Sequence, residues 1–256
     1  PAIERRRLPG QEGIELRGSV PLGGRPVVQN VAVDNPTLSF VAALRAALVA
    51  NGISVVGPAV DIDDLPTAPS PEGATPLLTY RSPPLSELAT TLMKLSQNQF
   101  AEAFFRTLGA SEGRATANGG RAAAQTILQG WGVAPGALVQ IDGSGLSRYN
   151  YVTPESLIAI LVHIDRDERL RAPFAASLPV AGSDDALARF RGTAADGKAR
   201  AKNGSMTSVR ALSGYVTTAD GETLAFSILA NNFEGPAAVI TSATDAVVVK
   251  LAEFRR

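Results

Sequence analysis

Apolar positions in the first quarter of the chain change from an alternating pattern to a helical one and back. The alternating runs predict strands, and a Gly-Gly turn separates the first two; they lie at residues 13–22, 26–33 and 53–62. Residues 37–50 repeat apolar side chains at helical spacing. Asn35 precedes this run as an N-cap, and Pro36 takes the first helical position. The pattern predicts a small α+β unit.

A proline-rich stretch, residues 65–76, follows this unit and is typical of a linker. Helical spacing is found beyond it at residues 85–95, 97–108, 121–131, 153–163, onward to about 176, and 236–254. Strand patterns are found at residues 137–141, 198–202, 209–218 and 222–231, with an Asp-Gly turn before the last. Helices, then an antiparallel meander, then a terminal helix predict an α+β domain with helices packed on a sheet. We therefore divide the chain into residues 1–75 and 76–256.

Composition excludes several classes of function. The 24 basic and 24 acidic side chains balance, which argues against binding nucleic acid. No apolar run is as long as a membrane span. The absence of cysteine excludes disulfides, iron–sulfur clusters and thiol catalysis, and a single histidine, His163, excludes a site of several imidazoles. A mechanism that needs a titratable amine has four lysines to choose from: Lys94, Lys198, Lys202 and Lys250.

Three short motifs carry candidate chemistry: Ser96-Gln97-Asn98 at a predicted helix break, Asp142-Gly-Ser-Gly-Leu-Ser147, and Lys202-Asn203-Gly204-Ser205. Each has a plain structural alternative, as a helix cap, a glycine-rich turn and a surface turn. Asp142 also stands where a nucleophile elbow requires glycine. A Ser-x-Asn followed much later by a Lys-x-Gly leading into an antiparallel strand is nevertheless the arrangement of active-site serine enzymes that open peptides or β-lactams.

In this order the motifs resemble the class C low-molecular-mass penicillin-binding proteins, the D-alanyl-D-alanine carboxypeptidase/endopeptidase family of bacterial peptidoglycan metabolism. The stretches that carry the resemblance are residues 16–23, 35–36, 82–85, 96–102, 142–148, 202–206 and 212–216. The resemblance implies a penicillin-binding/β-lactamase-like α+β fold with helices packed on an antiparallel sheet. It also implies that residues 1–75 end an inserted α+β domain and that residues 76–256 return to the penicillin-binding domain.

The resemblance assigns roles residue by residue. Ser96 would pass protons, Asn98 would orient a substrate amide, and the ammonium of Lys202 would supply positive potential. The substrate-binding residues it implies are Asn203, Gly204, Ser205 and Met206. Ser205 would give a backbone N–H to the oxyanion hole, and Met206 would line the side-chain pocket. Asn203 stands where the family has Thr, whose hydroxyl bonds a substrate carboxylate, so substrate preference or rate is open to change.

The family's first motif, Ser-x-x-Lys, does not occur in this sequence. The residues three positions before the four lysines are Thr91, Ala195, Ala199 and Val247. We interpret Lys94 as a helix-surface residue. We therefore expect the chain to be a C-terminal portion, inactive alone, whose attacking serine and base lie on an upstream segment.

The expected function is a serine-type D-Ala-D-Ala carboxypeptidase/endopeptidase that forms an acyl-enzyme, is acylated by penicillins, and needs no metal or organic cofactor. Its partners would be peptidoglycan peptides, β-lactams and the upstream segment, at a periplasmic or other extracytoplasmic location. Two alternatives stay open. One is a non-catalytic cell-wall-binding homologue of the same fold; the other is a β-lactam-hydrolysing enzyme, against which the long segment before residue 76 argues.

Overall fold

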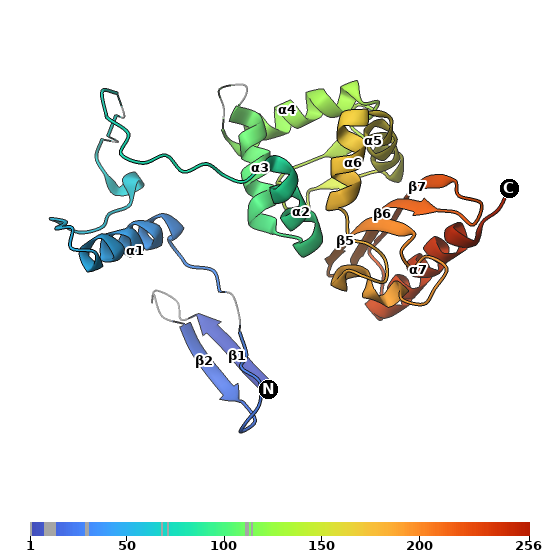
Figure 1. The fold of residues 1–256 in the computed structure, drawn as a ribbon, viewed down its shortest axis with the longest axis horizontal. Coiled ribbons are helices and arrows are strands. Elements are labelled where there is room, and N and C mark those ends of the chain that lie inside the picture. The colour runs from blue at the N-terminus through green and yellow to red at the C-terminus, as the bar shows by residue number, and fades with distance from the viewer. Residues whose placement is uncertain are drawn as a thin grey trace. The chain divides into compact units, whose positions relative to one another are not determined.

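The structure is a computed structural model. The residues it describes are 2–7, 14–28, 31–67, 69–70, 72–110, 113 and 115–256. The chain divides into two units, Pro1–Thr79 and Tyr80–Arg256 (Figure 1). In the part of the chain that the structure describes, no helix combines the length and the apolar character needed to cross a membrane.

The first unit holds a hairpin and one long helix. Its elements are β1 (Ala2–Arg7), β2 (Ile14–Ser19), α1 (Pro36–Ala50) and the short 3-10 helix η1 (Ile62–Asp64). Strands β1 and β2 pair antiparallel, from Ala2 opposite Ser19 to Arg7 opposite Ile14. Asn35 caps α1, because its Oδ1 accepts a hydrogen bond from the Leu38 N–H at 2.8 Å. The predicted start of this helix is confirmed.

Two of the predicted strands in this unit are wrong. The described residues within 26–33 and residues 53–61 lie in irregular, largely exposed chain, and Ile62 begins η1. Their alternating pattern meets no neighbouring strand, and a strand needs a partner for its backbone groups. Residues 14–19 do form a strand, but its partner is β1. Helix α1 has no buried residue, and among the unit's described residues only Asp61 is buried.

The second unit begins with a group of helices. They are α2 (Leu85–Leu95), α3 (Asn98–Ala110), α4 (Ala117–Gly130), α5 (Pro154–Arg166) and α6 (Glu168–Ser177). Thr116 and Thr153 cap α4 and α5 with their side-chain oxygens. A two-stranded ribbon of β3 (Leu138–Val139) and β4 (Tyr151–Val152) lies between α4 and α5 along the chain. The predicted helices are confirmed, with ends that differ by a few residues.

A three-stranded antiparallel sheet and a terminal helix complete this unit (Figure 1). The sheet has the order β5 (Ala199–Met206), β6 (Val209–Thr217), β7 (Thr223–Asn231), and η2 (Asp185–Phe190) precedes it along the chain. Helix α7 (Ala237–Glu253) packs on one face of the sheet, where Leu212 and Val216 of β6 belong to the same buried cluster as Val248 and Ala252 of α7. The α+β class with helices on an antiparallel sheet is confirmed.

Candidate active site

The Ser-x-Asn motif lies at a sharp break between α2 and α3. Ser96 ends α2 in the left-handed conformation, with φ 54° and ψ 51°, and Asn98 begins α3. Ser96 therefore does not cap the second helix, which was the structural alternative for this residue. A side chain with a Cβ is strained in this conformation, and such strain often occurs at functional sites. The break leaves the side chains of Ser96 and Asn98 exposed.

Helix α3 is held near this break by the loop that follows β3. One turn beyond Asn98, the Glu102 Oε1 atom accepts a hydrogen bond from the Ser144 N–H at 2.9 Å. Burial acts to raise the pKa of Glu102, but hydrogen bonds from Ser144 and Gly143 outweigh it and leave the pKa below its ordinary value. Gly143 packs so closely on α3 that a Cβ there would overlap the Ala101 carbonyl. The loop thus fixes the first two turns of α3.

Asp142 organises this loop. Its Oδ1 accepts hydrogen bonds from the Gly145 N–H at 2.7 Å and the Asn150 amide at 2.8 Å, and its Oδ2 accepts one from the Ser147 N–H at 2.7 Å. Asn150 in turn accepts a hydrogen bond from the Ile141 N–H at 2.6 Å. Both carboxylate oxygens are therefore committed to the loop, so the contribution of Asp142 is structural.

The Lys-x-Gly motif lies on β5, one of the two edge strands of the three-stranded sheet. Ala199 and Ala201 are in the core cluster, so Lys202, Gly204 and Met206 alternate to the opposite face of the sheet. The Lys202 Nζ atom donates a hydrogen bond to the Asn203 carbonyl at 2.6 Å. Burial lowers the pKa of Lys202.

The outer edge of β5 is only partly used. The Thr217 N–H donates a hydrogen bond to the Lys198 carbonyl. The main-chain N–H and C=O groups of the even-numbered residues of β5 therefore point toward β6, and those of the odd-numbered residues point away from it. On that outer edge the Ala201 N–H donates to the Pro179 carbonyl at 3.0 Å. Farther along, the N–H groups of Asn203 and Ser205 point outward, and neither donates to another of the described residues. The Ser205 N–H therefore lies on an open strand edge, close to the carbonyl that Lys202 contacts.

The two motifs are linked indirectly. Among the described residues, no hydrogen bond or ion pair joins Ser96 or Asn98 to Lys202. Lys94, however, extends from the last turn of α2 and forms an ion pair with Asp184 at 3.1 Å; both side chains are about 30% exposed. Lys94 is thus a partly exposed residue of helix α2, and its side chain is paired with a carboxylate 90 positions away in the sequence.

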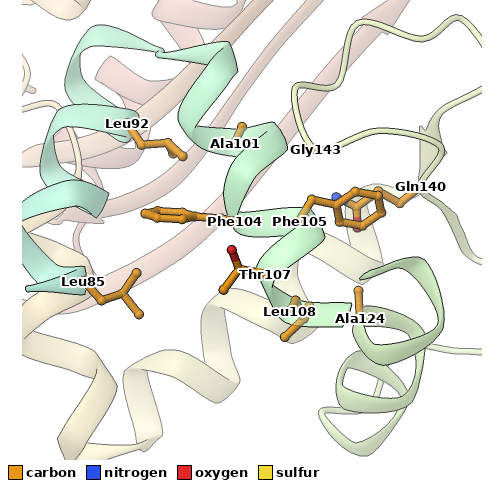
Figure 2. A pocket seen from close by; sticks show the side chains of 10 residues that line it. All are labelled: Leu85, Leu92, Ala101, Phe104, Phe105, Thr107, Leu108, Ala124, Gln140 and Gly143. Carbon is orange, nitrogen blue, oxygen red and sulfur yellow. The ribbon is translucent and has the colours of Figure 1, made fainter. Parts of the chain in front are cut away.

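A cavity of about 590 Å³ lies beside the first turns of α3. It is lined by Leu85, Leu92, Ala101, Phe104, Phe105, Thr107, Leu108, Ala124, Gln140 and Gly143. Figure 2 shows Phe104 directed toward the α2 side of this cavity and Phe105 toward Gly143 and Gln140. None of the lining side chains is ionisable, and none belongs to the predicted site. The cavity therefore offers apolar surface but no catalytic group.

Sequence reasoning assigned no role to three residues that shape this region: Glu102, Asp184 and Lys94. Glu102 follows Asn98 by four positions, a spacing that places both on one helix face, so its role near the break could have been predicted. The contact between Lys94 and Asp184 had no signal in the sequence, because it depends on how distant segments pack.

The fold defines a class of protein. The chain is similar to penicillin-binding protein 4 from Haemophilus influenzae, in a crystal structure with a β-lactam, with a TM-score of 0.74 and 24% identity over 99% of this chain and 59% of that one. It is also similar to the TLA-1 extended-spectrum β-lactamase, with a TM-score of 0.51 and 15% identity over 66% of this chain and 64% of that one. The fold is that of penicillin-binding proteins and β-lactamases.

Sequence comparison identifies the family within that class. The model of the D-Ala-D-Ala carboxypeptidase 3 (S13) peptidase family matches residues 4–253. The D-alanyl-D-alanine carboxypeptidase of Actinomadura sp. is 38% identical over 256 residues, which cover 96% of this chain and 46% of that protein. The chain belongs to the S13 peptidase family, and it spans about half the length of this relative. The resemblance stated from the motifs is confirmed at the level of the family.

Proposed function

We propose that this chain is part of a serine-type D-Ala-D-Ala carboxypeptidase/endopeptidase of peptidoglycan metabolism. The observation that carries the proposal is the open edge of β5 in a member of the S13 family, where the Ser205 N–H points outward two residues beyond the Asn203 carbonyl that the Lys202 ammonium contacts. The attacking serine and its lysine would belong to an upstream segment. The residues named for the second and third motifs would act on the substrate that this serine attacks.

The reaction would proceed through an acyl-enzyme. The serine oxygen of the upstream segment bonds to the carbonyl carbon of the penultimate D-Ala, and the C–N bond to the terminal D-Ala breaks. Ser96 relays the hydroxyl proton to the leaving amine, and Asn98 orients the substrate amide. The Ser205 N–H donates to the carbonyl oxygen as negative charge develops there. Water then hydrolyses the ester and frees the serine. In a β-lactam the cleaved C–N bond is in a ring, so the amine stays attached to the acyl group.

Lys202 would supply the positive potential that attracts the substrate's terminal carboxylate. Its ammonium contacts the strand's own Asn203 carbonyl and has no carboxylate within ion-pair distance among the described residues, so its charge is available to an anionic substrate. The Asn203 side chain alternates to the other face of the strand from Lys202. With Asn in place of the family's Thr, a carboxylate would be bound by an amide of different reach.

The test uses the protein with its upstream segment in place. We expect that protein to take a covalent label from a fluorescent penicillin and to release D-Ala from a peptide ending in D-Ala-D-Ala. Lys198→Met removes an exposed lysine outside the candidate site. It is the control for a change at Lys202, and it should take the label as the wild type does. A correctly folded protein that takes no covalent label would contradict the proposal. The substrate belongs to the cell wall, so the protein would work outside the cytoplasm.

A non-catalytic cell-wall-binding homologue is the second candidate. Asn203 in the Lys-x-Gly motif is the observation that favours it. This candidate predicts reversible binding to peptidoglycan peptides without a covalent penicillin adduct. The same labelling experiment, run beside a sedimentation assay with peptidoglycan, separates the two.

A further inference from the structure

The ion pair between Lys94 and Asp184 joins the helical part of the second unit to the segment that precedes its sheet. The Lys94 Nζ atom lies 3.1 Å from Oδ2 of Asp184 and 3.3 Å from Oδ1. Lys94 is two positions before Ser96, in the last turn of α2. Among the ion pairs of the described residues, this is the one that connects helices α2–α6 with the chain that leads into β5. A cation in the last turn also interacts favourably with the helix dipole.

Asp184 is held rigidly on the other side of this pair. Its Oδ2 accepts the Val180 N–H at 2.7 Å, and its own backbone N–H donates to the Val180 carbonyl at 3.1 Å. Gly182 makes the tight turn between them possible with a φ of +78°. The hydrogen bond from Val180, together with Lys94, holds the pKa of Asp184 below its ordinary value although burial opposes this. Arg200 adds positive potential from β5.

The turn that holds Asp184 is hydrogen-bonded directly to β5. Val180 bridges Arg200, the Ala181 N–H donates to the Ala199 carbonyl at 2.9 Å, and the Ala201 N–H donates to the Pro179 carbonyl at 3.0 Å. This pairing stops at Ala201, one residue before Lys202. A continuous series of contacts therefore runs from the last turn of α2, through Lys94 and Asp184, to the start of the Lys-x-Gly motif.

We propose that Lys94 and Asp184 are positioning residues that set the Ser96 hydroxyl relative to the Lys202 ammonium. The inference rests on the proposed function. Ser96 occupies a left-handed backbone conformation that persists only when its surroundings hold it. The contacts that run from Lys94 through Asp184 to β5 can hold this conformation, because Lys94 is only two positions before Ser96. The same contact explains why Thr91-Leu-Met-Lys94 does not replace the missing Ser-x-x-Lys, because the Lys94 ammonium is paired with a carboxylate.

The experiment measures acylation of the protein with its upstream segment by a fluorescent penicillin, separating penicillin binding from the acylation step. Lys94→Met and Asp184→Asn should each slow acylation about tenfold to a hundredfold while changing binding little, since a small misplacement of a reacting group has effects of this size. The double variant should be no slower than either single one. Lys94→Arg, which keeps the pair, should retain most of the rate. Lys250→Met, which breaks the exposed pair with Glu253 on α7, should match the wild type.

The Ser96→Ala background separates positioning from general stability. If the pair acts through Ser96, adding Asp184→Asn to Ser96→Ala should not slow acylation further. Two results would overturn the inference. One is an Asp184→Asn protein that is acylated at the wild-type rate; the other is an Asp184→Asn change that slows acylation as much in the Ser96→Ala background as it does in the wild type. If a single variant unfolds, Lys94→Arg and the exchange of the two charges, Lys94→Asp with Asp184→Lys, carry the test, and the exchange should recover part of the rate. Failure of the proposed function is distinct, because the wild type itself would then take no label.

Discussion

The two parts of the candidate site are held in place by different kinds of contact. Ser96 and Asn98 sit on an exposed helix break with a left-handed backbone, held in place by polar contacts from neighbouring loops. Lys202 lies on a strand whose other face is packed into the main buried cluster against α7. The sheet part therefore depends on core packing, whereas the helical part depends on a few hydrogen bonds and one ion pair. A substitution that disrupts the contacts of one part should therefore leave the structure of the other part intact.

The largest effect on activity is expected at Lys202. Lys202→Met should slow penicillin acylation about 10²–10³-fold, the size typical of losing one electrostatic contributor in a water-poor site. The protein should keep its melting temperature or gain slightly, because the half-buried ammonium is desolvated. Stopped-flow labelling and thermal denaturation measure the two quantities. Loss of stability without loss of rate would show that Lys202 is structural.

A pair of variants at Ser96 tests the helical part. Ser96→Ala and Ser96→Gly should each slow acylation about 10²-fold, since both remove the proton-relaying hydroxyl. Their stabilities should differ, because glycine adopts a φ of 54° without strain and alanine does not. We expect the Gly variant to be more stable than the Ala variant by about 1 kcal/mol in chemical denaturation. Equal acylation by wild type and both variants would remove Ser96 from the mechanism.

Gly214→Ala should damage the sheet part alone. A Cβ at this position of β6 would overlap the Arg200 carbonyl and Ala201 of β5. We expect the free energy of unfolding to fall by about 2 kcal/mol, as for overpacking of a core. Gly204→Ala is the matched stability control, because a Cβ there would meet only the Ala211 Cβ at an ordinary 3.5 Å. A stable Gly214→Ala protein would contradict the close packing of β5 on β6.

The smallest effect is a shift in the pH profile. Because burial lowers the pKa of Lys202, the ammonium should lose its charge at a lower pH than an ordinary lysine, and acylation should fall there. Lys202→Arg should move this alkaline limb to higher pH, since arginine stays protonated. The stability effect has the opposite sign: the desolvated charge is unfavourable below the folded-state pKa, so this contribution improves as pH rises toward the unfolded-state pKa. Identical alkaline limbs in both proteins would exclude titration of Lys202.

Local patterns in the sequence predicted most of the second unit. The spacing of apolar residues located α2, where residues 88–94 are partly buried, and the three strands of the sheet, each of which contributes residues to the core cluster. The same reasoning failed at residues 26–33 and 53–62, where an alternating pattern has no strand to pair with. Sequence spacing alone therefore predicts a strand reliably only where the fold also supplies its partner.

The candidate site was predictable as a set of motifs but not as an arrangement. The sequence placed Ser96 at a helix break without revealing that its backbone is left-handed. It placed Lys202 on a strand, but only the hydrogen-bonding pattern shows which of the neighbouring N–H groups face outward. The partner of Lys94 depends on a turn that closes 90 residues later. Geometry of this kind arises from packing between segments that carry no local signal for one another.

The open edge of β5 also limits the shape of what it can bind. A bare strand edge is a template onto which another extended chain can add as a further strand, through main-chain hydrogen bonds alone. The segment around Val180 already occupies the edge as far as Ala201, so the remaining edge has room for about three extended residues. A guest bound in this way would be selected first by being short, extended and free at one end, and only second by its side chains. The same shortness would protect the edge from indiscriminate pairing with other proteins.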